Sequence, residues 1–375
     1  MEVLALSIGR NILKQESRDR ARMRQYAEHL DGYHLIILTR KSDGYTEEVH
    51  EGTLHLYPTH STSRLSMLGD AYRISRRVMR EKKVPWVVVA QDPLELGWLS
   101  WLIAKATSAH LHIQVHGDYF SSSAWVGCSL FRRIRRFLAL MLLRRAPAIR
   151  VVSIRIEQSL IARGIAKERI TVLPIRPELE SFLEVNHSYR SIPPYTCLFI
   201  GRLAPEKNIP RIIRAFSLVL KHGEDIKLTI VGDGEEYARL TALVESLGIR
   251  ESVTFSKWTE RVQEEMSRAD IFLLASRHEA YALTLIEAMA VGLPVITTDV
   301  GCVGEVVEDG VHGLVVRSES DEAYAEAIRE LIQKPELQER YGRAGRSRAS
   351  EIGEGTQDEY VHAWVRSLTP REERV

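Results

Sequence analysis

Short apolar runs rich in valine, isoleucine and leucine recur along the chain, each followed by polar or glycine residues and then by a helical pattern. Because these runs do not alternate strictly between apolar and polar positions, they are typical of strands buried on both faces of a parallel sheet. The predicted strands span residues 3–9, 34–39, 54–58, 86–90, 111–116, 149–153 and 170–173 in the first half, and 196–200, 228–231, 253–256, 271–275, 295–298 and 314–316 in the second.

The alternation of strands and helices is interrupted between residues 175 and 194, where Pro174, Pro177, Pro193 and Pro194 accompany a polar stretch without clear periodicity. We therefore predict an α/β protein made of two doubly wound, Rossmann-like domains. In such sheets ligands bind beyond the carboxyl ends of the strands, where helix N-termini favour anions. The informative residues are therefore expected directly after strands.

The composition argues against several classes of protein. Of 375 residues, 45% are hydrophobic, and 51 basic against 50 acidic residues leave a net charge of +1, which gives no argument for a polyanionic partner. The widely spaced Cys128, Cys197 and Cys302 cannot form a disulfide framework or a CxxC metal pair. The first apolar run is too short for a signal peptide, and no apolar stretch reaches the roughly 18 to 20 residues of a membrane span. We expect a cytoplasmic protein.

One segment is strongly basic, since residues 119–156 contain eight arginines and no acidic residue. Apolar side chains recur there at helical spacing from Leu130 to Met141, and the arginines Arg132, Arg133, Arg135 and Arg136 fall on the opposite side. This basic amphipathic helix predicts reversible docking on the anionic inner face of a membrane. An ordinary helix packed on the sheet with a solvated basic face would give the same pattern. Nucleic acid is disfavoured because the segment lacks interleaved aromatic residues.

Glu279 and Glu287 are separated by seven residues around the predicted turn from a strand ending near Ser276 to a helix beginning near Leu283. On one continuous helix they would lie about 12 Å apart. We therefore place Glu279 in the turn and Glu287 in the first turns of the helix, where both can face one pocket. Phosphate would repel carboxylates, so their expected partners are hydroxyl groups, which sugars supply.

Cations are available where the strand at 196–200 ends. Arg202 can grip phosphate oxygens with its planar fork, and Lys207 can add a point charge where a glycosyl bond to phosphate breaks. The Gly232-Asp233-Gly234 turn is a weaker phosphate-site signal, because many Rossmann-like turns use it for structural reasons. His110, His112 and His116 share one strand face, but the outer two are about 20 Å apart and cannot share a metal ion.

At these residues the sequence resembles the retaining glycosyltransferases of family 4 (glycosyl transferases group 1), which have the two-domain GT-B architecture. Two glutamates seven residues apart, then Ala-Met-Ala, a glycine and a proline match residues 279–294, and segments 201–208, 231–234 and 299–310 follow in the family's order. The resemblance implies two Rossmann-like domains facing across a cleft. Residues 1–180 would bind the acceptor, residues 190–355 the donor, and residues 356–375 would form a helix crossing back to the first domain.

The resemblance also implies an activity, that of a retaining hexosyltransferase of class EC 2.4. A sugar would pass from a nucleotide diphosphate sugar, a UDP-sugar in preference to GDP-mannose, to a glycan or lipid-linked acceptor in cell-surface polysaccharide or glycolipid synthesis. The leaving phosphate would accept the acceptor's proton on the same face. Neither a metal ion nor another cofactor would be required.

Carried over residue by residue, the resemblance implies that Glu287 holds the ribose hydroxyls, Glu279 the transferred sugar, and Arg202 and Lys207 the diphosphate. His116 matches the family's cleft histidine, so the implied catalytic residues are His116, Glu279, Arg202 and Lys207. Further donor contacts would come from Gly232, after the strand at 228–231, and from the turn between the glutamates, at Ala280, Tyr281, Ala282, Leu283 and Thr284. The acceptor side would comprise Ser17, Arg20, Asp92, His116 and Asp118.

The sequence departs from the family pattern at Ala280 and Ala282, where glycines are usual, and at Thr284, where proline is frequent. Alanine resists positive φ and narrows the pocket by a methyl group. Two alternatives therefore stay open. One is a GT-B relative with different chemistry, a nucleotide-sugar epimerase or a phosphorylase, and the other is a non-catalytic module that binds a nucleotide sugar or a membrane.

Overall fold

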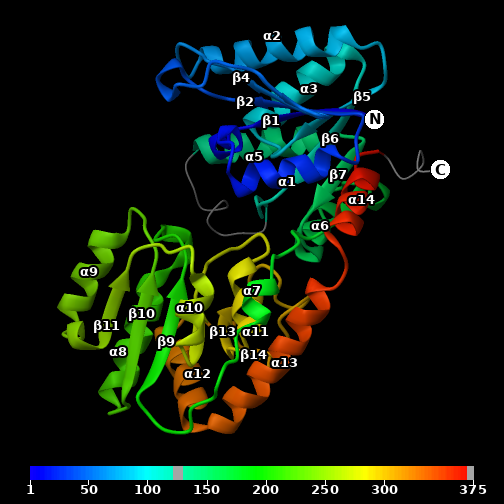
Figure 1. The fold of residues 1–375 in the computed structure, drawn as a ribbon. Coiled ribbons are helices and arrows are strands. Elements are labelled where there is room, and N and C mark those ends of the chain that lie inside the picture. The colour runs from blue at the N-terminus through cyan, green and yellow to red at the C-terminus, as the bar shows by residue number, and fades with distance from the viewer. Residues whose placement is uncertain (121–129, 370–375) are drawn as a thin grey trace. The chain divides into compact units, whose positions relative to one another are not determined.

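The computed structural model describes residues 1–120 and 130–369. Its described residues form two compact units (Figure 1). The first unit holds residues 1–120, 130–174 and 355–369, and the second holds residues 175–354. Cys128, part of the basic segment and residues 370–375 of the predicted terminal segment lie outside the described residues.

The first unit is built on an eight-stranded sheet with the order β3-β4-β2-β1-β5-β6-β7-β8. Every neighbouring pair is parallel except β3 and β4. The strands are β1 (Glu2–Ser7), β2 (Gly32–Ile37), β3 (Val49–Glu51), β4 (Leu54–Pro58), β5 (Trp86–Ala90), β6 (His110–Val115), β7 (Ala148–Val151) and β8 (Ile170–Val172).

Helices of the first unit cover the sheet on both sides, with α1 and α2 on opposite faces (Figure 1). They are α1 (Arg18–Ala27), α2 (Ser66–Glu81), α3 (Glu95–Thr107), α5 (Leu130–Leu143), α6 (Ile154–Ile161) and α14 (Gln357–Ser367), with short 3-10 turns η1 (Arg10–Leu13), η2 (Lys41–Asp43) and η3 (Lys167–Arg169). Helix α14 starts with a capping box, because Thr356 and Glu359 each accept the other's backbone N–H.

The C-terminal helix α14 belongs to the core of the first unit. Trp364 is buried and meets the ring of Tyr26 edge-on at a centroid distance of 4.7 Å, and it also contacts Tyr33 of β2. Val361 and Leu368 are fully buried in the same cluster. Helix α14 is therefore an integral part of the first unit although it comes last in the chain.

The second unit contains a six-stranded parallel sheet with the order β11-β10-β9-β12-β13-β14. Its strands are β9 (Tyr195–Ile200), β10 (Ile226–Val231), β11 (Val253–Ser256), β12 (Ile271–Leu274), β13 (Val295–Thr298) and β14 (Gly313–Val316). Its helices are α7 (Glu180–Leu183), α8 (Ile209–Lys221), α9 (Tyr237–Ser246), α10 (Val262–Ser267), α11 (Leu283–Val291), α12 (Asp321–Gln333) and α13 (Pro335–Gly353), with 3-10 turns η4 (Pro205–Lys207) and η5 (Arg250–Ser252).

The predicted α/β class and every predicted strand are confirmed, with strand ends shifted by about two residues or fewer. Strand β3 was not predicted. It is an antiparallel edge strand whose residues are all partly exposed, so it lacks the continuous apolar run that marks the others.

Candidate active site

In the second unit, the predicted donor residues lie on loops that leave the carboxyl ends of adjacent strands. Strands β9 and β12 are hydrogen-bonded neighbours, so the loop after β9, with Arg202 and Lys207, adjoins the loop after β12, with Glu279. The structure thus brings Lys207 to Glu279, 72 positions apart in the chain.

The Glu279 carboxylate is held from two sides. Its Oε1 atom accepts a hydrogen bond from Lys207 Nζ at 2.6 Å and another from Ser276 Oγ at 2.6 Å. The Lys207 and Glu279 side chains are only 19% and 13% exposed, so this ion pair is largely removed from water. Charge-assisted hydrogen bonds are stronger in such surroundings, and they fix the direction of the carboxylate. Ser276 was not singled out from the sequence, although a hydroxyl at a strand end was visible there.

Glu287 lies on α11, as predicted, and its surroundings differ from those of Glu279. Its carboxylate has no hydrogen bond or ion pair with any residue of the described ranges, and it is half-buried. Burial raises the pKa of Glu287 to about 7. A desolvated carboxylate with open lone pairs is suited to accept hydrogen bonds from hydroxyl groups.

Arg202 is exposed over 71% of its side chain and forms an ion pair with Glu206 on the same loop. An exposed pair of this kind contributes little to stability, so its guanidinium can exchange partners at small cost. The two cations predicted for a diphosphate therefore differ in their ion pairs. Lys207 is held by Glu279 in a largely buried pair, whereas the exposed Arg202 can leave Glu206 and bind another anion.

The Gly232-Asp233-Gly234 turn packs against the backbone of the Arg202 loop. Leu203 N–H donates to Asp233 O at 2.9 Å, and Glu236 N–H donates to Leu203 O at 3.0 Å. A Cβ atom on Gly234 would lie 2.2 Å from Leu203 O, and Gly232 has a φ of +151° with equally close backbone. These glycines are therefore required by close packing, and the turn positions the Arg202 loop.

Helix α11 begins in an uncommon way, because its N-cap residue, Ala282, has the left-handed values φ 66° and ψ 60°. No side chain caps this end, so the first N–H groups of the helix, at Leu283 and Thr284, have no intrahelical partner and can bind an anion. Tyr281 O accepts from Cys302 N–H at 3.0 Å, which ties the turn to the loop after β13. The structure shows that alanine adopts here the backbone conformation for which glycine is the usual residue.

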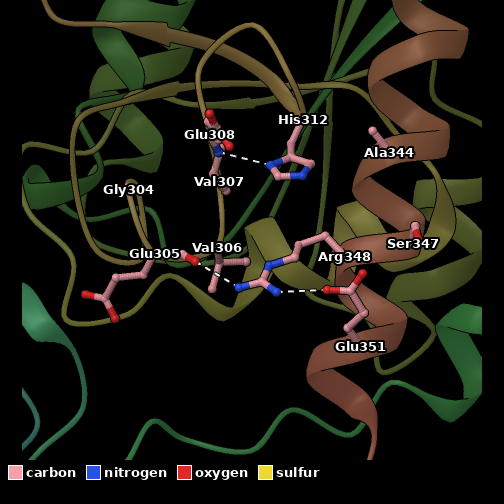
Figure 2. A pocket seen from close by; sticks show the side chains of 10 residues that line it. All are labelled: Gly304, Glu305, Val306, Val307, Glu308, His312, Ala344, Ser347, Arg348 and Glu351. Carbon is pink, nitrogen blue, oxygen red and sulfur yellow. Dashed lines mark hydrogen bonds and ion pairs between the residues drawn. The ribbon is translucent and has the colours of Figure 1, made fainter.

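A separate cavity of about 490 Å³ lies in the second unit beside the loop between β13 and β14 and the helix α13 (Figure 2). Arg348 lies in its middle and donates to Glu305 O at 3.1 Å and to Glu351 Oε2 at 2.8 Å, while His312 Nδ1 accepts from Glu308 N–H at 3.0 Å. None of the predicted site residues lines this cavity.

In the first unit, His116 directly follows β6 and is half-buried, as its predicted position required. Its Nε2 atom lies 2.9 Å from Gln114 Oε1, which in turn lies 3.1 Å from Nη1 of the buried Arg150. Burial, together with the Arg150 charge, lowers the pKa of His116 to about 4, so the imidazole is neutral at pH 7. Gln114 and Arg150 were not predicted, although polar residues inside otherwise apolar strands were a visible signal.

The other predicted acceptor-side residues have structural contacts. Asp118 accepts from Phe120 N–H at 3.4 Å, which caps the turn after His116. Ser17 is the N-cap of α1 and accepts from Arg20 N–H at 3.1 Å, while the buried Arg20 guanidinium pairs with Glu51. Asp92 accepts from Leu94 N–H at 2.7 Å, and burial raises its pKa. These contacts explain Ser17 and Arg20 without a ligand.

Helix α5 does not bury the apolar row that the alternative prediction, packing on the sheet, requires. Its buried residues are Ala139, Leu142 and Leu143, whereas Phe137 is 63% exposed. The apolar side chains on its outer face are Leu130, Phe131, Ile134, Phe137 and Leu138. Arg132 and Arg133 are exposed, but Arg135 and Arg136 are half-buried, and Arg135 Nη2 lies 2.7 Å from Glu95 Oε2 of α3. The apolar face therefore points outward. Within the described ranges, no helix has both the length and the hydropathy of a bilayer-spanning segment.

Comparisons with known proteins identify the family and the fold. The family described as glycosyl transferases group 1 matches residues 190–348, and the glycosyl transferase 4-like domain matches residues 20–176. The chain belongs to this glycosyltransferase family. Sucrose-phosphate synthase from Thermosynechococcus elongatus has the same fold, with a TM-score of 0.74, 19% identity, and 97% of this chain and 98% of that chain covered. The expected GT-B fold of two Rossmann-like units is confirmed.

Two further proteins are similar to this chain, one in sequence and one in fold. Alpha-D-kanosaminyltransferase of Streptomyces kanamyceticus is 32% identical over 145 residues, which cover 38% of this chain and 38% of that protein. Anabaena HepE, solved in complex with UDP-glucose, superposes with a TM-score of 0.71 at 16% identity and covers 97% of this chain and 98% of its own. The chain thus matches less than half the length of the curated relative.

Proposed function

We propose that this glycosyltransferase family member transfers a sugar from a nucleotide diphosphate sugar to a glycan or lipid-linked acceptor, with retained configuration and without a metal ion. The observation that carries the proposal is the pair of carboxylates on the two sides of one turn, Glu279 paired with Lys207 and Glu287 open to hydroxyl partners. UDP-sugars are the favoured donors and GDP-mannose is next, and the complex of HepE with UDP-glucose supports this order.

The geometry supports a separate role in donor binding for each of these side chains. Glu287 would accept hydrogen bonds from the ribose hydroxyls, and Glu279 would hold a hydroxyl of the transferred sugar. The diphosphate would lie at the N-terminus of α11, near Arg202 and Lys207, whose charges offset the negative charge that develops as the glycosyl bond breaks. The leaving phosphate would take the acceptor's proton, so no protein nucleophile is needed.

Binding of nucleotides tests this proposal first. We expect UDP and a UDP-sugar to raise the melting temperature more than GDP or ADP, because a ligand of the folded state stabilises it by mass action. Glu287→Ala should weaken nucleotide binding by about 1.5 to 3 kcal/mol, the range for hydrogen bonds to a charged group. Glu260→Ala, on an exposed carboxylate of the second unit, is the matched control. Unchanged affinity of the Glu287 variant would contradict its assignment to the ribose.

Turnover distinguishes the proposal from its alternatives. Transfer to an added acceptor in the presence of EDTA, with the anomeric configuration of the product read by NMR, would support retaining, metal-independent transfer. Release of a free epimer or phosphorolysis of a glycan would favour the epimerase or phosphorylase. Tight nucleotide binding with no turnover on any acceptor would favour a non-catalytic binding module.

We also propose that α5 docks the protein reversibly on an anionic membrane, at the cytoplasmic face where a lipid-linked acceptor is presented. The outward apolar row from Leu130 to Leu138 would enter the interface, and the exposed Arg132 and Arg133 would meet the lipid phosphates at about 1 kcal/mol each. The half-buried Arg135 is held by Glu95, so its part in docking is smaller than the sequence indicated.

Vesicle sedimentation tests the docking. The protein should sediment with vesicles of phosphatidylglycerol and phosphatidylcholine, and less with phosphatidylcholine alone. Phe131→Ser with Phe137→Ser, or Arg132→Glu with Arg133→Glu, should abolish sedimentation and leave donor binding intact. The exposed Arg239 and Arg261 of the second unit, both changed to glutamate, provide the control. Sedimentation of the α5 variants at the level of the unmodified protein would refute membrane docking.

A further inference from the structure

A buried arginine in the middle of β7 is the least expected residue of the first unit. Arg150 is only 3% exposed, and a buried guanidinium must be hydrogen-bonded because desolvation is costly. Its donors reach Leu173 O at 3.0 Å, Pro174 O at 3.3 Å, Gln114 Oε1 at 3.1 Å and Tyr360 Oη at 2.7 Å. In the described part of the chain no carboxylate pairs with Arg150, so its positive charge remains uncompensated within the unit.

The donors of Arg150 settle the orientation of the Gln114 amide. An arginine can only donate hydrogen bonds, so the Gln114 atom that faces it must be the oxygen. The same oxygen lies 2.9 Å from His116 Nε2. Since an amide oxygen can only accept, His116 Nε2 must carry a hydrogen, and in the neutral ring Nδ1 is then the bare acceptor.

The last helix of the chain completes this network. The Tyr360 hydroxyl of α14 accepts a hydrogen bond from Arg150 and donates one to Pro174 O at 3.0 Å. It therefore links Arg150 to the backbone just after β8. The titratable groups near the network include Arg150 on β7, Tyr360 on α14 and Tyr26 on α1, with Asp118 in the turn two residues after His116, and burial raises the pKa of Tyr26.

We infer that Tyr360, Arg150 and Gln114 are positioning residues that hold His116 in its neutral Nε2–H form and so make Nδ1 an acceptor for a hydroxyl of the sugar substrate. The inference rests on the proposed glycosyl transfer for the identity of that hydroxyl. His116 lies at the carboxyl end of β6, where ligands of such sheets bind, and its Nδ1 has no hydrogen-bond partner among the described residues.

The network also limits what His116 can do. Because burial, and to a smaller extent the nearby Arg150 charge, disfavours the imidazolium, His116 is a poor proton acceptor at neutral pH. It is suited to orient a hydroxyl by accepting a hydrogen bond, and not to remove its proton. This role is compatible with proton transfer to the leaving phosphate.

The test begins with the ring nitrogens of the full-length protein, without any ligand. Long-range 1H–15N spectra, with His116 assigned by the loss of its signals in His116→Gln, should show a protonated Nε2 and a bare Nδ1 from pH 8 to pH 5. Gln114→Leu should yield a mixture of tautomers, and Arg150→Met should move the His116 titration midpoint upward, because it removes the positive charge near the ring. Protonation of Nδ1, or an imidazolium at pH 6 in the unmodified protein, would overturn the inference.

Gln114→Leu or Arg150→Met could unfold the first unit, so two more conservative variants test the same network. Gln114→Glu keeps an acceptor beside Nε2 but adds a negative charge, so it should keep the tautomer and raise the titration midpoint. Tyr360→Phe removes one hydroxyl and should shift the midpoint upward by a smaller amount. Tyr324→Phe, which removes a buried hydroxyl that donates to Ile296 O in the second unit, should leave the His116 spectrum unchanged.

Kinetics then connect the network to the reaction. Gln114→Leu and Arg150→Met should lower kcat/KM for transfer about tenfold or more, while Gln114→Glu should retain transfer above its raised His116 titration midpoint. The expected spectra without any transfer would count against the proposed function only. Transfer activity together with the other tautomer would count against the positioning network only.

Discussion

Lys207 Nζ lies 2.6 Å from Glu279 Oε1, and this contact joins the loop after β9 to the loop after β12. Both side chains are largely shielded from water, so each charge depends on the other more than an exposed pair would. The ion pair fixes the direction of the Glu279 carboxylate, and under the proposed function it would keep a cation next to the diphosphate. This ion pair connects the segment at residues 201–208 with the glutamate motif at residues 279–294.

Replacement of Lys207 by methionine should lower the rate of sugar transfer about 100-fold to 1,000-fold, the usual effect of removing one preorganised group that stabilises developing charge. Steady-state kinetics with a saturating donor would measure this loss. Lys334→Met removes an exposed ion pair with Glu330, Nζ to Oε1 3.0 Å, and should change neither rate nor stability appreciably. Equal rates for both variants would show that Lys207 does not act on the leaving group.

Glu287 should make the protein less stable as the pH rises. Its pKa is raised from 4.5 to about 7 in the folded chain, so the folded state binds more protons than the unfolded state between these values. The contribution to stability present below pH 4.5 is therefore lost as the pH rises through 7. Glu287→Gln should increase the free energy of unfolding at pH 8 by an amount on the order of 3 kcal/mol, and change it little at pH 4.5.

Urea unfolding of the Glu287→Gln variant at the two pH values would measure this effect. Glu260→Gln, on an exposed carboxylate, should show no pH-dependent gain. A gain of the same size at both pH values would mean that packing, and not ionisation, explains the Glu287 variant.

Gly234→Ala should destabilise the protein by about 2 to 3 kcal/mol, because the new methyl group would overlap the Leu203 carbonyl and displace the backbone. Since Leu203 follows Arg202, nucleotide affinity should fall as well. Thermal unfolding and calorimetry would record both changes. Gly69→Ala, in an open position on α2, should instead stabilise the protein slightly by its helix propensity. A Gly234 variant with full stability would contradict the close packing of the two loops.

Acid should weaken the first unit through buried histidines. His34 bonds to Glu2 Oε2 at 2.9 Å and to Tyr57 Oη at 3.1 Å, and burial lowers its pKa to about 4. Because the unfolded chain protonates near the ordinary value of 6.5, the folded state binds fewer protons between pH 6.5 and 4. The stability contributed above pH 6.5 is therefore lost as the pH falls through 4, by an amount on the order of 3 kcal/mol for this residue.

Denaturant unfolding followed by tryptophan fluorescence at several pH values would measure that loss. His34→Gln should flatten the decline between pH 6.5 and 4, whereas the exposed His222→Gln should leave it unchanged. A decline as steep in the His34 variant as in the unmodified protein would place the acid sensitivity elsewhere.

Helix α5 shows that a periodic pattern does not predict which face of a helix packs on the protein. The spacing of Leu130, Ile134 and Phe137 predicted an apolar face, and that face exists, but a helical wheel does not tell which side meets the protein. In the structure Ala139, Leu142 and Leu143 contact the core and Glu95 binds Arg135, which turns the longer apolar row outward. Only the tertiary packing decided the orientation.

The sequence by itself determined the strands, the two Rossmann-like units and the place of the glutamate motif, because buried parallel strands and strand-to-helix turns follow from local apolar runs and turn residues. It did not determine which distant groups meet. That Lys207 binds Glu279, that Gly234 packs against Leu203, and that Tyr360 reaches Arg150 across 210 positions depends on strand order and helix docking. The reason is physical, since side-chain charges and hydrogen bonds act over a few ångströms, and only the folded chain brings such residues within that range.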